Sequence, residues 1–270
     1  MNQTCVIMYG LPKNFKKVWN NYNKYLFNFN KNTIFTVSLH LYDDIGSLTN
    51  LRNNEINIPI INTKEMMDII NNNKAKNIKS LSIINSSQNI FDREIDWINK
   101  SPIKCFKKDY SIETIKNIFR SGNSMRLAYL NVNKLHNTYI FCRSDSLLVN
   151  NIKIVNMLDN DMFIQSFGKN ELNNRFFITG SISADIMSIC LTNNGIKKYL
   201  ENCRNVNTEQ LFKKWALDNN INIILKKKKW AQFIRIRGYN TYNNSDVRKN
   251  FFNFYNDCIL NEFHKLISSF

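Results

Sequence analysis

The sequence predicts an α/β fold built on a Rossmann-like mixed, mainly parallel sheet flanked by helices. The first observation is the order strand, helix, strand between residues 4 and 41, because such a crossover joins parallel neighbours in one sheet. The second is that helical and strand-like apolar patterns keep alternating from residue 111 to residue 236. Neither an internal repeat nor a convincing linker interrupts the chain, so we expect one domain over residues 1–270.

Apolar spacing, and the residues that end it, mark the opening elements. Residues 4–9 form a short apolar run that stops at Gly10, Leu11 and Pro12, as a buried strand does at a turn. Residues 33–41 predict a second strand, which ends before Asp43 and Asp44. Between them, apolar side chains at three- and four-residue spacing predict an amphipathic helix: Phe15, Val18, Trp19, Tyr22, Tyr25 and Leu26.

The middle of the chain is Asn-rich and less regular. Residues 51–101 predict only a helix around residues 64–71 and a strand over residues 78–85. From Ser111 the pattern is regular again, and a helix is expected to run from there to residue 130. Residues 138–149 predict the next strand, although Arg143, Ser144 and Asp145 interrupt its apolar side chains.

The last part of the chain continues the alternation. We expect a short strand near Phe163, a strand over 175–180, helices over 183–191 and 209–218, strands over 221–225 and 233–236, and a C-terminal helix over 247–266. The aromatic side chains of that last helix, Phe251 and Phe254 among them, have helical spacing and are expected to pack in the core.

Composition limits the class of protein and of partner. The hydrophobic content of 43% is ample for a core, and the net charge of +16 points to an acidic partner such as nucleic acid, an anionic membrane or a phosphorylated ligand. The abundance of Asn, Ile and Lys is also typical of an AT-rich genome, so codon bias is an alternative source of the charge. No apolar run approaches the roughly 20 residues that cross a bilayer, and no signal peptide is indicated, so we expect a cytoplasmic protein without a transmembrane segment.

The six cysteines are widely spaced, with no C-x-x-C pair and no histidine at ligand spacing. We therefore expect buried free thiols rather than a zinc site or a disulfide framework.

Three candidate sites fall where predicted strands end. Open α/β sheets bind ligands at the carboxyl ends of their strands, near a topological switch point. Gly10 follows the first strand, Asp43 and Asp44 follow the second, and Arg143 and Asp145 lie further along. Arg143 and Asp145 form either an internal ion pair or a site in which Asp145 binds a divalent cation and Arg143 contacts phosphate.

Four motifs, taken in order, resemble a family of GT-A-type glycosyltransferase-like proteins of large DNA viruses and algae. The resemblance extends from about residue 4 to residue 237 and rests on these stretches: Gly10-Leu11-Pro12-Lys13, Arg143-Ser144-Asp145-Ser146-Leu147-Leu148, Asn173-Asn174-Arg175-Phe176-Phe177-Ile178-Thr179-Gly180-Ser181, and Thr208-Glu209-Gln210-Leu211-Phe212.

The resemblance implies a GT-A fold and the transfer of a sugar from a nucleotide-diphosphate sugar to a hydroxyl of a glycan or protein acceptor. It suggests a viral protein, and in that case the host cytoplasm or the virion is the expected location. It gives Asp145 the role of metal ligand, for Mn²⁺ or Mg²⁺, and, if the transfer inverts, makes Glu209 the candidate general base. The donor would lie against Gly10, Leu11, Pro12, Lys13, Arg143 and Arg175.

Several of these residues also have simpler interpretations. Glu209 would suit the start of a helix that has Thr208 as its N-cap residue. Arg143 occupies the position where a second acidic residue would complete the metal motif. The protein could therefore be a catalytically inactive binding module with the same fold. The Asp-x-Asp spacing of Asp159 and Asp161 is predicted to be a polar turn.

A basic cluster supports a different function class. It consists of Lys226, Lys227, Lys228, Lys229, Trp230, Arg235 and Arg237. Basic residues with an interleaved aromatic predict binding of nucleic acid or anionic lipid. The alternative is a solvated hairpin turn between two strands. His40, near the end of the second strand, is expected to be structural.

Overall fold

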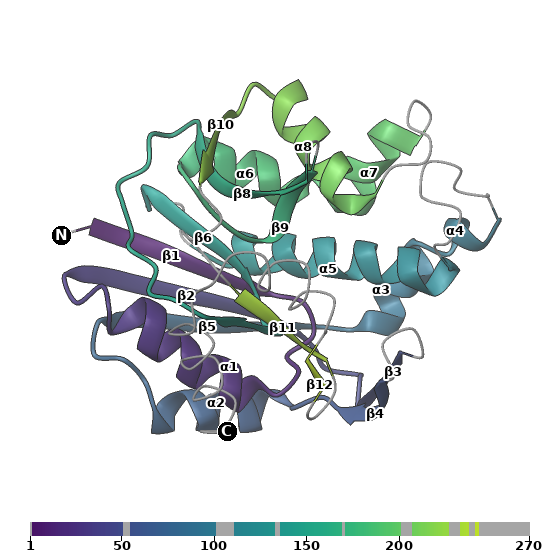
Figure 1. Ribbon diagram of the computed structural model, residues 1–270. Coiled ribbons are helices and arrows are strands. Elements are labelled where there is room, and N and C mark those ends of the chain that lie inside the picture. The colour runs from purple at the N-terminus through teal and green to yellow at the C-terminus, as the bar shows by residue number, and fades with distance from the viewer. Residues whose placement is uncertain are drawn as a thin grey trace.

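The computed structural model describes residues 2–50, 55–100, 111–132, 136–168, 171–200, 207–226, 233–237 and 241–242. Its centre is a seven-stranded sheet with helices on both faces (Figure 1). The strands of this sheet are, in spatial order, β10 (Asn222–Lys226), β8 (Asp161–Gly168), β9 (Glu171–Thr179), β6 (Thr138–Arg143), β1 (Asn2–Tyr9), β2 (Thr33–Tyr42) and β5 (Ile78–Ser86).

The sheet is mixed and mainly parallel, as predicted. β1 pairs in parallel with β2 on one side and with β6 on the other, and the pairs β2–β5 and β10–β8 are parallel as well. In this sheet β9 runs antiparallel to both of its neighbours, β6 and β8. The predicted strand–helix–strand opening is therefore confirmed as a parallel crossover unit.

One face of the sheet is covered by α1 (Phe15–Tyr22), its π-helical continuation η1 (Asn23–Phe27) and α2 (Thr63–Asn72). Their apolar side chains pack on inward-facing residues of β1 and β2 in one buried cluster, which includes Trp19, Met66, Ile70, Val6, Met8, Val37 and Leu39. The side chains that recur at helical spacing from Phe15 to Leu26 form the apolar stripe that packs on this face of the sheet.

The opposite face is covered chiefly by α5 (Ile112–Leu130), α6 (Ser181–Ile189) and α8 (Thr208–Asp218). Ser111 begins α5 as predicted, because its Oγ accepts a hydrogen bond of 3.1 Å from the Thr114 amide. A second buried cluster fills this side and contains Ile7, Phe119, Met125, Phe141, Phe177, Met187, Phe212 and Trp215.

The remaining elements are short. They are β3 (Ser47–Asn50), β4 (Glu55–Pro59), α3 (Gln88–Glu94), α4 (Trp97–Lys100), β7 (Ser146–Leu148), α7 (Asn193–Leu200), β11 (Phe233–Arg237) and β12 (Thr241–Tyr242). β3 pairs with β4, and β11 pairs with both β7 and β12, so two small antiparallel sheets accompany the main one.

Two predictions about the strands are wrong. The single strand over residues 138–149 is two strands, β6 and β7, separated by a turn at Ser144 and Asp145. The ladder with β1 ends there because β1 itself turns away at Gly10. The hairpin between residues 226 and 233 does not form, because β10 pairs with β8 while β11 pairs with β7 in a different sheet.

Side chains of the basic cluster lie outside the described residues, except for Lys226, whose Nζ lies 3.6 Å from the centre of the Phe163 ring. The expected C-terminal helix also lies outside them. None of the helices in the described ranges combines the length and apolarity that crossing a bilayer requires.

Three cysteines are described, and all three are buried free thiols, as predicted: Cys5, Cys142 and Cys190. Burial raises the pKa of Cys142 to about 12, so this thiol stays protonated at neutral pH. Cys105, Cys203 and Cys258 lie outside the described residues.

Candidate functional site

The topology places a switch point between β1 and β6. The chain leaves β1 through α1 on one face of the sheet and reaches β2 on one side of β1. It later crosses the other face through α5 and enters β6 on the opposite side of β1. Connections that diverge in this way open a crevice at the carboxyl ends of the two strands, where ligands of open α/β sheets bind. Tyr9, Gly10 and Arg143 are the residues at these strand ends.

Arg143 and Asp145 form an ion pair at this point. Nε of Arg143 donates to Oδ1 of Asp145 at 2.8 Å, and Nη2 donates to Oδ2 at 3.1 Å. Nη1 donates to the Ser121 hydroxyl on α5 at 3.0 Å. Only 1% of the Asp145 side chain and 16% of the Arg143 side chain are exposed. The pair is therefore bidentate and largely removed from water.

The surroundings keep the Arg143 charge in place. Burial works against that charge, but Asp145 outweighs it, and Tyr9 and Glu209 add to the effect, so the pKa of Arg143 is raised. Arg143 is thus a fixed cation, oriented by Asp145 and Ser121.

Gly10 lies directly under the Arg143 guanidinium. Its φ angle is +87°, and a Cβ at this position would lie 3.4 Å from Nη2 of Arg143. The Gly10 amide donates to Ser124 Oγ at 2.9 Å, and its carbonyl accepts from Ser144 Oγ at 2.9 Å. The turn predicted after the first strand therefore needs glycine for its backbone angle.

The next three residues complete this turn. The Lys13 amide donates to the Leu11 carbonyl at 2.9 Å, which makes the turn tight. Pro12 is buried and Leu11 is partly buried. Lys13 is only 3% exposed, although it carries an ammonium group. The turn thus holds a second cation close to the end of β1.

Tyr9 is a residue of this region that sequence reasoning missed. Its hydroxyl donates to the Asn174 carbonyl and so joins the end of β1 to the interior of β9. Burial raises the pKa of Tyr9, with Arg143, Asp145 and Arg175 acting on it electrostatically. Its position as the last residue before the Gly10 turn is the one sequence signal that marks it.

Arg175 and Glu209 reach the same end of the sheet from other elements. Arg175 lies on β9 beside the end of β6, because the residue after it, Phe176, pairs with Cys142. Glu209 lies in the first turn of α8, close enough to raise the pKa of Arg143. The fold therefore gathers the predicted site residues, from four separate stretches, around the carboxyl ends of β1 and β6.

The N-cap of α8 differs from the prediction. Asn207, not Thr208, precedes the first helical residue, and its Oδ1 accepts from the Gln210 amide at 2.7 Å. Gln210 Oε1 in turn accepts from the Asn207 amide at 3.1 Å. This reciprocal pair is a capping box, which fixes the helix start one residue earlier.

The acidic candidates outside this group, Asp44 and the Asp-x-Asp stretch of Asp159 and Asp161, have structural roles. Asp44 stabilises the N-terminus of α3, whose N-cap residue is Ser87, because its carboxylate accepts from the Ser87 hydroxyl at 2.6 Å and from the Gln88 and Asn89 amides at 2.7 and 2.9 Å. Burial opposes the Asp44 charge slightly, but these bonds outweigh it and lower the pKa.

The Asp-x-Asp stretch is a polar turn at the start of β8, as predicted. Asp159 accepts from Ser181 Oγ at 2.7 Å, and Asp161 accepts from the Asn222 side chain at 2.7 Å. The register places it at the end of the sheet opposite Arg143, since Met162 and Tyr139 both pair with Thr179.

His40 is buried on β2, facing α5, as expected for a structural histidine. Its Nε2 lies 2.7 Å from Ser86 Oγ, and its ring packs edge-on against Tyr42. Burial lowers the pKa of His40 to about 4.

The described residues show no site that would hold a divalent cation by protein side chains alone. Within the described ranges, no three His, Cys, Asp or Glu side chains come together in a way that could hold a metal ion. Asp145, the predicted ligand, has both of its oxygens bonded to Arg143. Its carboxylate therefore orients the Arg143 guanidinium.

No protein-family model matches this chain, and no curated protein matches its sequence. Among solved structures, mouse xyloside xylosyltransferase 1 in its apo form is similar, with a TM-score of 0.44, 10% identity and coverage of 84% of this chain and 85% of that one. The galactosyltransferase LgtC, in complex with donor and acceptor sugar analogues, has a TM-score of 0.43 and 9% identity over 83% and 73% of the two chains. An active-site mutant of LgtC has a TM-score of 0.41 and 8% identity over 80% and 70%. At these values the likeness does not assign a function to this chain.

Proposed function

We propose that this protein is a glycosyltransferase that moves a sugar from a nucleotide-diphosphate donor to a hydroxyl group of a glycan or protein, with the whole chain as one catalytic domain. The observation that carries the proposal is the oriented Arg143 guanidinium at the switch point of the sheet. This is the position at which open α/β sheets bind nucleotides.

Arg143 has hydrogen-bond donors left for a ligand. A guanidinium has five N–H groups, of which two point to Asp145 and one to Ser121. The two that are left, one on each terminal nitrogen, have no partner in the described part of the chain. A pair of N–H groups on one edge of a guanidinium matches two oxygens of a phosphate. Asp145 acts here as a positioning residue, because it holds the other edge.

The rest of the strand end suits the same ligand. Gly10 has no side chain, so a phosphate can approach the backbone under Arg143. Lys13 and Arg175 add positive charge beside the ends of β1 and β6. When the bond to the sugar breaks, its electron pair moves onto the diphosphate oxygen. Fixed cations lower the energy of that developing charge.

Glu209 is the proposed general base. Its carboxylate would take the proton of the acceptor hydroxyl while the hydroxyl oxygen attacks the anomeric carbon and the diphosphate leaves. The electrostatic effect of Glu209 on Arg143 supports the assignment of both residues to one site.

Thermal stability tests donor binding. We expect one class among UDP-, GDP- and dTDP-sugars to raise the melting temperature, because a ligand at about 100 times its Kd adds roughly 2.7 kcal/mol to the folded state. Arg143→Lys keeps the charge but loses the paired N–H groups, so it should weaken this binding at least tenfold. An oligonucleotide serves as the comparison. The absence of stabilisation by every nucleotide sugar would reject the proposal.

Turnover separates catalysis from binding. Glu209→Gln should preserve the donor-induced shift and lower sugar transfer by about 10²- to 10⁴-fold, which is the range for loss of a general base. Glu65→Gln is the control, because Glu65 also lies in the first turn of a helix, α2, where it closes a capping box that glutamine can keep. Equal activity of both variants would exclude Glu209 as the base. Donor binding by the native chain without any transfer would instead identify an inactive binding module.

A further inference from the structure

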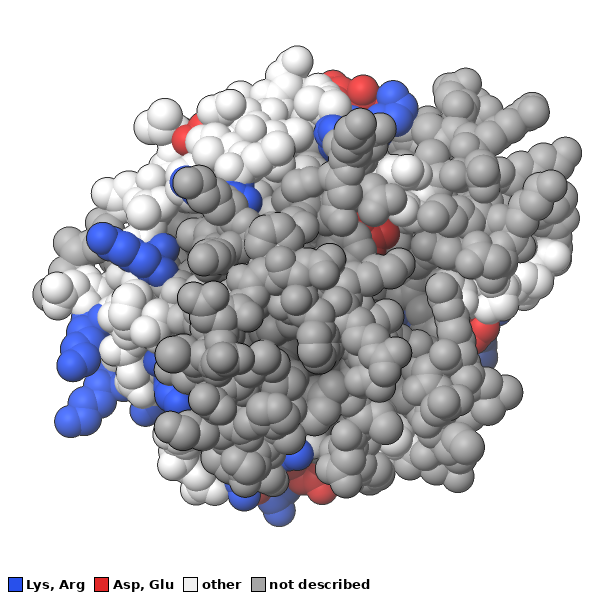
Figure 2. Space-filling view, viewed as in Figure 1, with Lys and Arg blue, Asp and Glu red and all other residues white. Residues whose placement is uncertain are grey.

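A set of exposed lysines lies at the end of the sheet opposite Arg143. They are Lys24 and Lys31 on either side of the turn before β2, Lys74 and Lys76 in the turn before β5, and Lys153 in the segment between β7 and β8. We call these five residues the lysine edge. Figure 2 shows blue side chains gathered along the left side of the described surface, the side on which β1 begins in Figure 1.

Two asparagine side chains hold the three segments together. The Asn30 amide donates to the carbonyls of Leu26 and Ile152, each at 2.7 Å, and its oxygen accepts from the Ile154 amide at 3.0 Å. Asn77 donates to the carbonyls of Phe27 and Asn30 at 2.9 and 3.0 Å. The lysine edge is therefore a fixed arrangement of charges from segments far apart in the sequence.

Acidic residues are missing from all three segments. The sequence has no Asp or Glu in residues 1–42, 69–91 or 146–158. Within the described ranges, none of the five lysines forms an ion pair. In the described part of the chain, the positive charge of these three segments is therefore not neutralised by ion pairs, which favours attraction of a polyanion.

Apolar side chains lie among these lysines. Phe29, in the turn between Lys24 and Lys31, is 45% exposed, and Val155, two residues after Lys153, is 36% exposed. Lys24 packs over the ring of Tyr25, with Nζ 4.8 Å from its centre. Lysines beside exposed apolar side chains match a bilayer interface, where ammonium groups meet anionic headgroups and apolar groups enter the acyl boundary.

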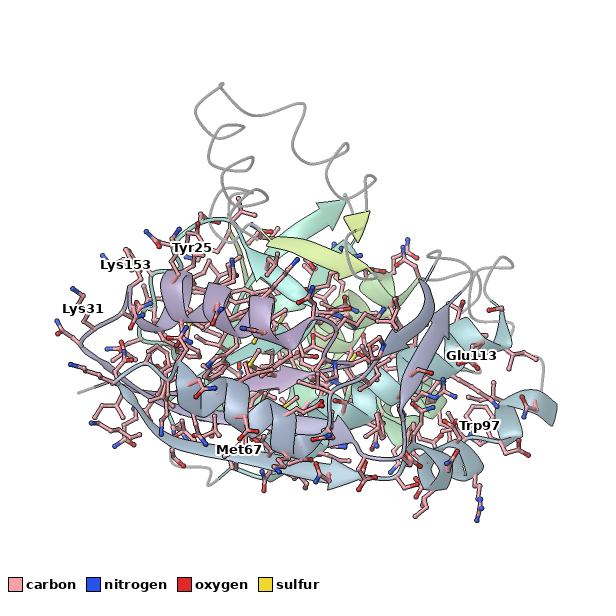
Figure 3. The ribbon with its side chains drawn as sticks, turned by 90° about the horizontal axis from the view of Figure 1, so that it is seen from below. Tyr25, Lys31, Met67, Trp97, Glu113 and Lys153 are labelled. Atoms are coloured by element: carbon pink, nitrogen blue, oxygen red, sulfur yellow. The ribbon has the colours of Figure 1, made fainter. Side chains whose placement is uncertain are left out.

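We propose that the lysine edge docks the protein on an anionic lipid membrane. Phe29 and Val155 favour a membrane over duplex nucleic acid, because a phosphate backbone uses the charges but offers apolar side chains no apolar surroundings. The inference is independent of the proposed function. Figure 3 shows Tyr25, Lys31 and Lys153 at one end of the molecule and Trp97 and Glu113 at the other. A docked molecule would therefore turn the ends of β1 and β6 away from the lipid.

Sedimentation with vesicles tests this proposal. We expect the full chain to bind vesicles of about 70% phosphatidylcholine and 30% phosphatidylserine and not pure phosphatidylcholine. Lys31→Gln/Lys153→Gln should reduce the partition coefficient about 25-fold, because each lysine near such a surface contributes about fivefold. Phe29→Ser should weaken binding without changing its salt dependence. The control, Lys64→Gln/Arg93→Gln, removes the same charge from exposed residues on α2 and α3.

Each outcome of the vesicle experiment either supports or overturns docking of the lysine edge on an anionic membrane. A loss confined to the lysine-edge variants supports the proposal. An equal loss in the control double variant would mean that net charge alone drives binding, and absence of binding to the anionic vesicles would overturn the proposal directly. Binding of a duplex oligonucleotide that depends on Lys31 and Lys153, without vesicle binding, would reassign the surface to nucleic acid.

Discussion

At the scale of single residues, the structure shows the first of the two interpretations that the sequence left open for Arg143 and Asp145, an internal ion pair. The pair lies at the switch point with part of the guanidinium left for a ligand. Sequence alone predicts charge at a strand end. It cannot show that Ser121, more than twenty positions earlier, would fix the same guanidinium.

His40 gives a prediction for the pH dependence of stability. Its pKa is about 4 in the folded chain and 6.5 for an ordinary histidine, so protonation favours unfolding. The stabilisation is complete above pH 6.5 and is lost as the pH falls toward 4. Between pH 7 and pH 5, the free energy of unfolding should fall by about 2 kcal/mol through His40 alone.

Urea denaturation at the two pH values measures this loss. His40→Gln should be less sensitive to pH by that amount, because glutamine does not titrate. His136→Gln, which changes another buried histidine, is the control. If His40→Gln keeps the pH dependence of the native chain, the loss arises from other groups.

At the scale of elements, periodicity predicted the long helices and core strands, while caps set their limits. α5 begins at the predicted Ser111 cap, but the capping box of Asn207 and Gln210 moves the start of α8 by one residue. Short elements such as β3, β4 and α7 were missed, because each holds only one to three apolar side chains, too few for a clear pattern.

Gly122 provides a test of how α5 packs. A Cβ on Gly122 would lie 2.0 Å from the backbone oxygen of Leu191, which follows α6. Alanine favours an isolated helix by about 1 kcal/mol over glycine, but here it would force α5 away from that backbone. Gly122→Ala should therefore destabilise the protein by about 3 kcal/mol or more.

Thermal or urea unfolding measures the effect of Gly122→Ala. Gly46→Ala is the control, since a Cβ there meets no atom within 4 Å. The control should change stability by less than about 1 kcal/mol. A stabilised Gly122→Ala variant would show that helix propensity outweighs the contact between α5 and Leu191.

At the scale of the whole molecule, the net charge of +16 predicts a dependence of stability on salt. Repulsion among like charges destabilises a compact state, and the screening length falls from about 30 Å at 0.01 M salt to about 10 Å at 0.1 M. Raising NaCl across this range should increase the free energy of unfolding by about 1 kcal/mol, or the melting temperature by about 2–4 °C.

Urea is the suitable denaturant for that measurement, because guanidinium chloride is itself a salt. Sucrose at matched osmolality controls for effects of the solute that do not involve charge. A decrease in stability with added NaCl would mean that attractive pairs, such as Arg120 with Asp92, outweigh the repulsion among lysines.

The sequence by itself determined the α/β class, the parallel opening unit, the long helices and the glycine turn after β1. These depend on local spacing and on backbone angles that neighbouring residues set. The tertiary structure decided where β10 and β11 pair, which groups surround Arg143, and that three acid-free segments meet at the lysine edge. Those outcomes depend on contacts between distant stretches, whose free energies no local pattern records.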